Sequence, residues 1–299
     1  MNANGIFHLR IHFPTLSSVI KMIWNIQGRN LDLTSHAQVM GILNVTPDSF
    51  SDGGQFCAIE AAITHARKMI AEGAAIIDIG GESTRPGALP VESKEEIRRT
   101  IPVIRSLRAE WDGLISIDTM KAAVAQAALD AGADIVNDVS GLTADQEMAP
   151  VCAGSQCGIV IMHMRGTPAD MQRNPTYTDV VTEVRDFFLE RLEQLATYGF
   201  SPTRLCFDPG IGFGKTLEHN LALLRHLDEL SPADIPLLVG VSRKSLITKL
   251  TGAQLPADRD AATFALTAMA RMQGVRIHRV HDVKGNLAAL RTVEGLLGA

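Results

Sequence analysis

Long apolar runs, paired cysteines and an excess of basic residues are all missing from this sequence. No stretch of about 18 consecutive apolar residues occurs, so we expect no membrane span. The formal net charge is −5, from 28 basic and 33 acidic side chains, which disfavours duplex nucleic acid as a partner. No CxxC pair or histidine cluster is present, which disfavours a zinc site. We therefore expect reduced, structural thiols in a cytoplasmic protein at Cys57, Cys152, Cys157 and Cys206.

What the chain does have is enough apolar material for a large core. Hydrophobic residues make up 46% of 299 residues, which excludes a disordered chain. No low-complexity linker follows Val39, and α/β barrels reach this length as one domain, so we predict a single domain over residues 22–299. Residues 1–21 lack a signal-peptide core, because polar residues and a proline interrupt their apolar patches. We interpret them as an N-terminal extension that is either not translated or disordered.

Short β-branched runs alternate with helical segments from Val39 onward. Their spacing is about 34 residues, which is the length of one βα unit. The runs are apolar on both faces, which is typical of a parallel sheet that is covered on both sides. The eight predicted strands are Val39–Leu43, Ala75–Ile79, Leu114–Ile117, Asp134–Val136, Gly158–Met162, Arg204–Phe207, Pro236–Val241 and Arg276–Val280.

Segments with helical periodicity lie between these predicted strands. The pattern Ser93-x-x-Glu96 predicts a capping box at the start of one helix. The predicted helices are Ala58–Ala71, Ser93–Glu110, Lys121–Leu129, Tyr177–Tyr198, Leu217–Leu230, Asp258–Met272 and Gly285–Leu297, with a shorter one at Ala144–Val151.

Eight βα units favour a closed (β/α)₈ TIM barrel, with an open doubly wound sheet as the alternative. Upstream of the first unit, Met22–Ile26 and Asn30–Leu33 flank a Gln-Gly-Arg turn. We expect this segment to form an N-terminal β-hairpin that plugs the bottom of the barrel.

Polar residues collect at the carboxyl ends of the predicted strands, where a barrel places its function. Asp118, Asn137 and Asp208 each lie at or just past the end of one strand. One such residue alone is as consistent with a helix cap or a turn as with a ligand contact. Three of them in one barrel mouth predict a polar wall that binds a flat heterocycle through several hydrogen bonds.

Basic side chains follow the last two strands. Lys244 lies in the segment Ser-Arg-Lys-Ser at 242–245, and Arg279 and His281 lie at the end of the eighth strand. Barrels commonly bind phosphate on these loops, so we expect an anion site there, with a solvated basic turn as the alternative. His163 lacks such neighbours in the sequence, and we expect it to be structural.

The glycine-rich segment from Asp208 to Thr216 resembles a nucleotide-binding loop only superficially. Its spacing is GxGxG, which fits neither the P-loop nor the GxGxxG fingerprint. We expect its glycines to allow the backbone to approach a bound ligand closely.

The run MGILNVTPDSFSDGG, residues 40–54, resembles the first signature of the dihydropteroate synthases. The run GGESTRPG, residues 80–87, resembles their second signature. The resemblance extends from about Trp24 to the C-terminus, with every block present in order. The later blocks are DPGIGFGK at 208–215, SRKS at 242–245 and RVHDV at 279–283.

The resemblance implies a folate-pathway transferase with a (β/α)₈ barrel. Members of that family condense 6-hydroxymethyl-7,8-dihydropterin diphosphate with p-aminobenzoate, which gives 7,8-dihydropteroate and diphosphate. They use Mg²⁺, are usually homodimers, and bind sulfonamides in the p-aminobenzoate site. We therefore expect two small-molecule substrates, a magnesium ion and a second copy of the chain as partners.

The resemblance also implies roles for individual residues. Those implied to bind the pterin are Asp118, Asn137, Met162, Asp208, Phe213 and Lys244. Those implied to hold the diphosphate are Asn44, Thr84, Arg279 and His281, with Asn44 also binding the metal. Those implied to form the p-aminobenzoate pocket are Phe50, Thr84, Pro86 and Ser245. Those expected to act in catalysis are Asp48, Arg85 and Lys244.

The residue types agree with this chemistry. The N–H donors of a pterin suit Asn137 and Asp208, and its acceptors suit Lys244. Loss of diphosphate first would give a ring-stabilised cation that the arylamine attacks directly, so no Ser or Cys nucleophile is needed. We expect the segments Thr46–Gly54 and Ser83–Pro90 to close as lids that exclude water.

Two other interpretations stay open. A pterin-binding barrel that passes a methyl group to a corrinoid could share the polar wall, but it would not need the anion site or the first lid. A non-catalytic paralogue that only binds a pterin should have lost lid or anion-site residues, whereas every block is intact here.

Overall fold

The computed structural model describes residues 21–46, 54–85, 87–232 and 235–298. Within this part of the chain the barrel strands are β3 (Gln38–Asn44), β4 (Ile76–Gly80), β5 (Leu114–Asp118), β6 (Ile135–Asp138), β7 (Gly158–Met162), β8 (Leu205–Asp208), β9 (Leu238–Val239) and β10 (Ile277–Val280). All are parallel, in the order β8-β7-β6-β5-β4-β3-β10-β9. An isolated parallel bridge from Phe207 to Leu237 joins the two ends of the sheet. The sheet is therefore a barrel, and the open doubly wound alternative is wrong.

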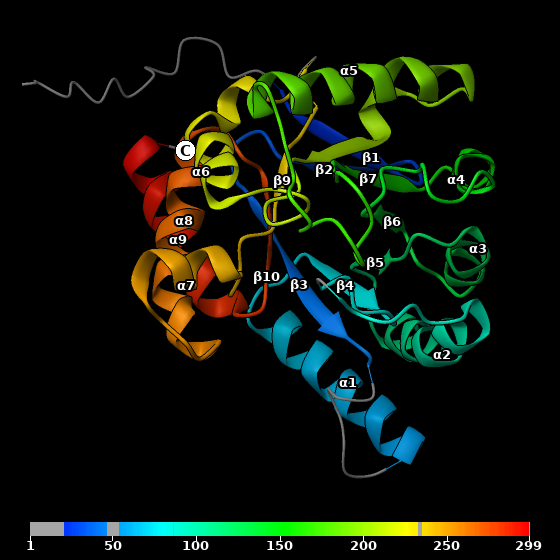
Figure 1. Cartoon of the computed structure of the whole chain (residues 1–299). Coiled ribbons are helices and arrows are strands. Elements are labelled where there is room, and N and C mark those ends of the chain that lie inside the picture. Colours follow the sequence, from blue (N-terminus) through cyan, green and yellow to red (C-terminus); the bar gives the residue numbers. More distant parts are fainter. Residues whose placement is uncertain (1–20, 47–53, 86, 233–234, 299) are drawn as a thin grey trace, which may run out of the picture.

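Helices surround this barrel, as Figure 1 shows. Their bounds are α1 (Gly54–Ala71), α2 (Ser93–Glu110), α3 (Ala122–Asp130), α4 (Met148–Ser155), α5 (Val180–Thr197), α6 (Leu217–Arg225), α7 (Ser245–Thr251), α8 (Asp260–Met272) and α9 (Val283–Leu297). The short helix α7 was not among the predicted elements, because seven residues are too few to show a helical period.

Several predicted boundaries are wrong for identifiable reasons. β9 keeps two of its six predicted residues, and Pro236 ahead of it has no N–H to donate to the ladder. Ser93 does not form a capping box, since it is the first helical residue of α2 and Glu92 is the N-cap. The Glu96 side chain instead accepts from Lys121 Nζ at 2.6 Å. The helix α5 begins at Val180, where the Asp179 side chain caps two backbone N–H groups.

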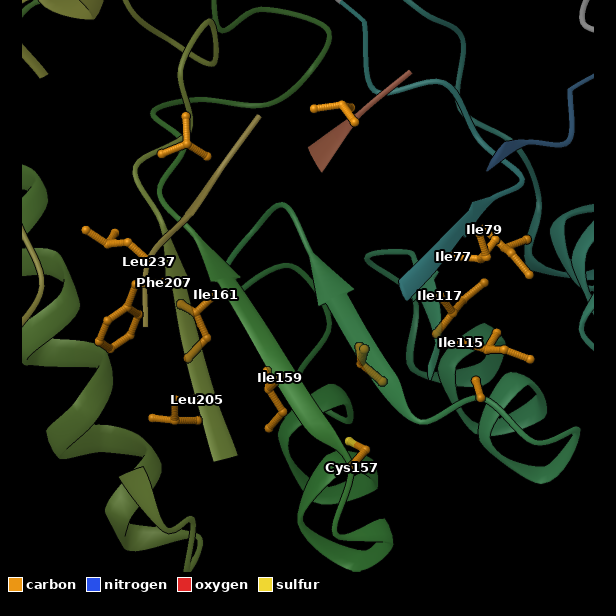
Figure 2. Close-up of a cluster of buried hydrophobic side chains, with 14 of the residues drawn as sticks. Ile77, Ile79, Ile115, Ile117, Cys157, Ile159, Ile161, Leu205, Phe207 and Leu237 are labelled. Carbon is orange, nitrogen blue, oxygen red and sulfur yellow. The ribbon is translucent and has the colours of Figure 1, made fainter. Parts of the chain in front are cut away.

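The alternation of side chains along each strand separates an outer core from an inner one. Outward-facing residues such as Ile77, Ile117 and Phe207 pack beneath the helices (Figure 2). Inward-facing apolar residues pack against a hairpin of β1 (Ile23–Ile26) and β2 (Arg29–Asp32). Trp24 of this hairpin is fully buried and donates from Nε1 to Arg204 O at 2.8 Å. The hairpin therefore closes one end of the barrel, as predicted.

The inner face of the barrel changes from apolar to polar along the strands. The inner core contains Ile76, Ile135, Cys206 and Ile277. Residues two positions apart point to the same side of a strand. The next inward-facing residues on these strands are polar, namely Asp78, Asn137, Asp208 and Arg279. The barrel thus has an apolar floor and a polar mouth at the carboxyl ends of its strands.

Three further expectations concern the chain as a whole. No helix within the described ranges is long and apolar enough to cross a membrane. Three cysteines are buried free thiols, namely Cys152, Cys157 and Cys206, while the Cys57 side chain lies outside the described residues. The division into an extension and one domain stays a prediction, because residues 1–20 also lie outside the described part.

Candidate active site

One guanidinium joins two carboxylates at the centre of the mouth. Arg279 Nε donates to Asp78 Oδ2 and Arg279 Nη2 donates to Asp118 Oδ2, each at 2.6 Å. Burial raises the pKa of Asp118 to about 7, although the charge of Arg279 opposes that shift. Burial acts to lower the pKa of Arg279, but the two carboxylates outweigh it and the pKa is raised. The resemblance assigned Arg279 to the diphosphate, whereas its guanidinium here lies among the carboxylates of the mouth.

A second contact ties Asn137 to the same carboxylate. Asn137 Nδ2 donates to Asp78 Oδ2 at 3.1 Å, and Asp78 is fully buried on β4. Sequence reasoning does not single out Asp78. The signal that could have found it is one aspartate within the apolar strand sequence Ile-Ile-Asp-Ile-Gly.

Asp208 begins the glycine-rich loop and fixes its first turn. Asp208 Oδ1 accepts from Gly210 N at 2.7 Å. Gly210 has a φ of +65°, and a Cβ there would lie 2.0 Å from His163 O. Only glycine allows the two loops to approach so closely. Burial raises the pKa of Asp208, against the opposing charge of Lys244.

Lys244 extends over this loop. Its Nζ donates to Ile211 O and lies 4.6 Å from the centroid of the Phe213 ring. Burial lowers the pKa of Lys244 to about 8, although Asp208 opposes the shift. Met162 is buried at the end of β7, and its Cγ would lie 3.3 Å from a Cβ on Gly210. The structure thus places Asp208, Lys244, Phe213 and Met162 around one loop.

A buried pair, Lys215 and His163, supports the same loop. Lys215 Nζ lies 2.9 Å from His163 Nδ1 and donates to the carbonyl oxygens of Gly210 and Phe213, at 3.1 and 3.0 Å. Burial, followed by the charge of Lys215, lowers the pKa of His163 to about 2, so the ring is neutral and accepts. His163 therefore positions the loop. Lys215 was missed because its Gly-Lys-Thr motif fails the P-loop spacing.

His281 follows β10 and lies beside Ser242, on the loop after β9. His281 Nδ1 is 2.9 Å from Ser242 Oγ. Burial and then the charges of Arg243, Arg279 and Arg85 lower the pKa of His281 to about 3, so the ring is neutral. A neutral imidazole can donate an N–H hydrogen bond to an anion, and the cations beside it attract that anion.

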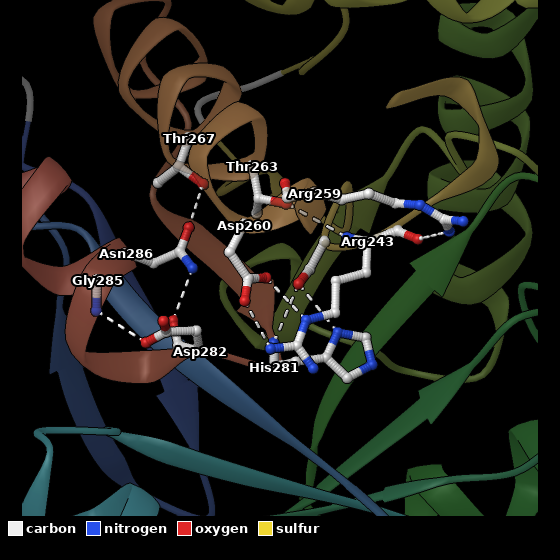
Figure 3. A network of polar contacts seen from close by, with 10 residues as sticks. Arg243, Arg259, Asp260, Thr263, Thr267, His281, Asp282, Gly285 and Asn286 are labelled. Carbon is white, nitrogen blue, oxygen red and sulfur yellow. Dashed lines mark hydrogen bonds and ion pairs between the residues drawn. The ribbon is translucent and has the colours of Figure 1, made fainter. Parts of the chain in front are cut away.

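Arg243 is held by a fork on Asp260, with both contacts at 2.7 Å (Figure 3). Its φ of +57° is uncommon for a residue with a side chain. Because Arg243 and Lys244 both have partners, the alternative of a solvated basic turn is wrong.

The remaining predicted site residues lie around the rim. Asn44 ends β3, and a Cβ on Gly80 would lie 3.8 Å from Asn44 Oδ1 and 3.6 Å from Asp118 Cβ. Thr84 is half-buried in the loop after β4, Arg85 is exposed beside it, and Ser245 is an exposed first residue of α7. No hydrogen bond within the described ranges joins Thr84 or Ser245 to the mouth. Predictions for Asp48, Phe50 and Pro86 lie outside the described residues.

A groove of about 730 Å³ lies beside the mouth, between the loops that follow β4, β5, β6 and β7. Its lining includes Glu82, Lys121 and Pro168, and none of the polar wall residues. Its volume lies in the range of ligand-binding pockets. The buried donors and acceptors favour the mouth instead, because they are what fixes a ligand's orientation.

Comparison with known proteins agrees with this chemistry. Residues 40–281 match the family model described as pterin binding enzyme. Dihydropteroate synthase from Synechocystis sp. is 48% identical over 265 residues, which cover 89% of this chain and 92% of that protein.

Two solved structures are similar over nearly the whole chain. Yersinia pestis dihydropteroate synthase, in a sulfonamide drug complex, has a TM-score of 0.87 at 44% identity and covers 93% of this chain and 100% of that one. Xanthomonas albilineans dihydropteroate synthase with 4-aminobenzoic acid has a TM-score of 0.87 at 42% identity, with 94% and 100% covered. From these matches and the polar barrel mouth, we conclude that the chain belongs to the dihydropteroate synthases, a family of pterin-binding transferases of folate biosynthesis.

Proposed function

We propose that this chain joins 6-hydroxymethyl-7,8-dihydropterin diphosphate to p-aminobenzoate, releasing 7,8-dihydropteroate and diphosphate. The observation that carries the proposal is the buried wall of Asp118, Asn137 and Asp208, with the half-buried Lys244 and the neutral His281 in the same mouth. The wall offers acceptors for the donor edge of a pterin, and the histidine side offers donors for an anion.

The wall is matched to a ring that carries several N–H groups. Asp118 Oδ1 is buried and has no hydrogen-bond partner within the described residues. Such an acceptor is costly unless a ligand donates to it. Asn137 Oδ1 and the Asp208 carboxylate supply further acceptors, and Lys244 Nζ supplies a donor. A ring with a different donor pattern would leave these groups unpaired, which gives strong discrimination.

The reaction we propose begins with cleavage of the C–O bond to diphosphate. The bonding electrons leave with the diphosphate, and the positive charge spreads over the pterin ring, where the carboxylates of Asp118 and Asp208 stabilise it electrostatically. The lone pair of the p-aminobenzoate nitrogen then forms the new C–N bond, and that nitrogen loses its proton to the released diphosphate. His281 and Arg85 act on the departing negative charge. No covalent enzyme intermediate is required.

Asn44 is the residue we propose as a ligand of Mg²⁺. No group of three His, Cys, Asp or Glu side chains suited to a metal occurs within the described ranges. Magnesium keeps several waters and needs few protein oxygens, so one amide oxygen at the open edge beside Gly80 fits it. When bound, the ion would neutralise charge on the diphosphate.

We propose that Thr84 and Ser245 contribute to the p-aminobenzoate pocket, together with Phe50 and Pro86, which lie outside the described residues. Gly87 N donates to Pro168 O at 3.2 Å, so the loop after β4 already contacts the loop after β7. This contact supports a role for Ser83–Pro90 as a lid. The proposed partner lid, Thr46–Gly54, and its Asp48 lie largely outside the described residues.

We further propose a homodimer in a reducing, cytoplasmic compartment. Exposed apolar side chains on successive helices support the dimer, namely Leu250 on α7 and Met269 and Met272 on α8. The three buried free thiols support the compartment.

Binding of p-aminobenzoate tests the proposed function against the non-catalytic paralogue. We expect tight binding only when 6-hydroxymethyl-7,8-dihydropterin and diphosphate are both present with Mg²⁺, measured by titration calorimetry. Equally weak binding with and without them would favour the paralogue.

A further inference from the structure

We propose that Asp78 is a positioning residue that sets the ring selectivity of the site, by holding Asn137 with its amide oxygen presented to the ligand. This inference rests on the proposed function, since the ring that Asn137 would contact is a pterin.

The geometry of Asp78 assigns it a role of its own. Asp78 is fully buried, and its Oδ2 accepts both from Asn137 Nδ2 at 3.1 Å and from Arg279 Nε at 2.6 Å. Asp78 lies two residues before the end of β4, in register with Ile42 of β3 and Ser116 of β5. Its side chain therefore lies deeper in the barrel than the residues at the strand ends. It therefore acts on the ligand through Asn137 and Arg279.

The direction of the Asn137 hydrogen bond follows from the chemistry of the partner. An ionised carboxylate only accepts, whereas an amide can donate from nitrogen or accept at oxygen. Arg279 Nε lies 2.6 Å from Asp78 Oδ2 in an ion pair, in which the carboxylate is the acceptor. Asn137 must then turn its Nδ2 toward Asp78, and its Oδ1 becomes the side available to a ligand. Within the described part of the chain, no hydrogen bond uses this oxygen.

This arrangement converts an ambiguous side chain into a defined acceptor. A free asparagine could rotate its amide and serve rings with either a donor or an acceptor at that point. With the amide held, a ring lacking the matching N–H leaves Asn137 Oδ1 unpaired in a buried site. The other wall carboxylates do not have this function, because Asp118 pairs with Arg279 and Asp208 pairs with the backbone of Gly210.

The test compares dissociation constants for three ligands: 6-hydroxymethyl-7,8-dihydropterin, its oxidised form, which lacks the N8–H, and its analogue without the 2-amino group. We expect the unchanged protein to prefer the first ligand. Asp78→Asn keeps the shape of the side chain but lets it donate, so Asn137 can turn. In this variant the preference over at least one analogue should fall roughly tenfold, the effect of one buried hydrogen bond.

Asp134→Asn is the matched control. Asp134 is also a buried, arginine-paired aspartate, but it lies before β6 at the other end of the barrel, held by Arg108 and by Ile115 N. We expect this variant to lose stability and keep the full ring preference.

A reversed pair provides the second variant. In Asp78→Asn/Asn137→Asp the amide at 78 donates to the carboxylate at 137, so an acceptor again faces the ligand. We expect this double variant to fold and to recover the preference that Asp78→Asn loses, which a purely structural role would not produce. If Asp78→Asn does not fold, the reversed pair carries the test alone.

The possible outcomes distinguish failure of the proposed role of Asp78 from failure of the proposed function of the protein. An unchanged protein that binds none of the three ligands contradicts the proposed function. A selective unchanged protein whose Asp78→Asn variant keeps both preferences contradicts the role of Asp78. A reversed pair that fails to fold, or that folds without selectivity, also contradicts that role.

Discussion

Gly210 provides a quantitative test of how closely the loops of the mouth must approach each other. Its φ is +65°, and a Cβ would lie 2.0 Å from the backbone oxygen of His163. In Gly210→Ala the left-handed conformation costs about 1–2 kcal/mol. Displacing the two backbones adds about 1–3 kcal/mol, as in an overpacked core. We therefore expect the free energy of unfolding to fall by about 2–5 kcal/mol, measured by urea denaturation.

Gly199→Ala is the control for the conformational term. Gly199 has a φ of +80°, but nothing lies within 4 Å of the position its Cβ would take. Its loss should be only about 1–2 kcal/mol. The loop after Gly210 carries the Ile211 carbonyl that accepts from Lys244, so Gly210→Ala should also weaken pterin binding by roughly tenfold. The reasoning is refuted if both variants lose equal stability and keep equal pterin affinity.

Three further predictions follow from the site and its support. The pH profile of kcat/KM should be bell-shaped, since protonation of Asp118 below a pKa of about 7 removes an acceptor and deprotonation of Lys244 above a pKa of about 8 removes a donor. Lys244→Arg should move the alkaline limb upward, and a profile that stays flat through both values would contradict these assignments. Arg85→Ala should lower kcat far more than pterin affinity, because Arg85 acts near His281 and not on the ring; equal losses in a kinetic and calorimetric comparison would argue against this. Trp24→Ala should reduce the free energy of unfolding by about 3–5 kcal/mol while pterin affinity is unchanged, and weaker binding at equal stability would show that the hairpin affects the mouth.

The barrel could be predicted from local patterns because each unit carries its own signals. Buried parallel strands are apolar throughout, and β7 has the bounds that its apolar run predicts. Boundaries failed where another interaction decided them. Glu96 contacts Lys121 from a neighbouring element, so it was not free to form the capping box.

Asp118, Asn137 and Asp208 could be found because they lie at or next to the ends of β5, β6 and β8, where a barrel directs side chains into its mouth. Their partners could not be found in the same way. The contacts of Asp78 with Asn137 and Arg279 depend on the register of separate strands and span 59 and 201 residues of sequence. Local sequence patterns contain no information on which distant residues come into contact. The same limit hid the support that Lys215 and His163 give to the glycine-rich loop.

Diphosphate release tests the central claim most directly. The purified protein would be given the pterin diphosphate and Mg²⁺, with and without p-aminobenzoate. We predict release that depends on p-aminobenzoate, formation of dihydropteroate, and no activity in Lys244→Ala, because the wall would lose its cationic donor. Tight pterin binding with no dihydropteroate formed would contradict the account.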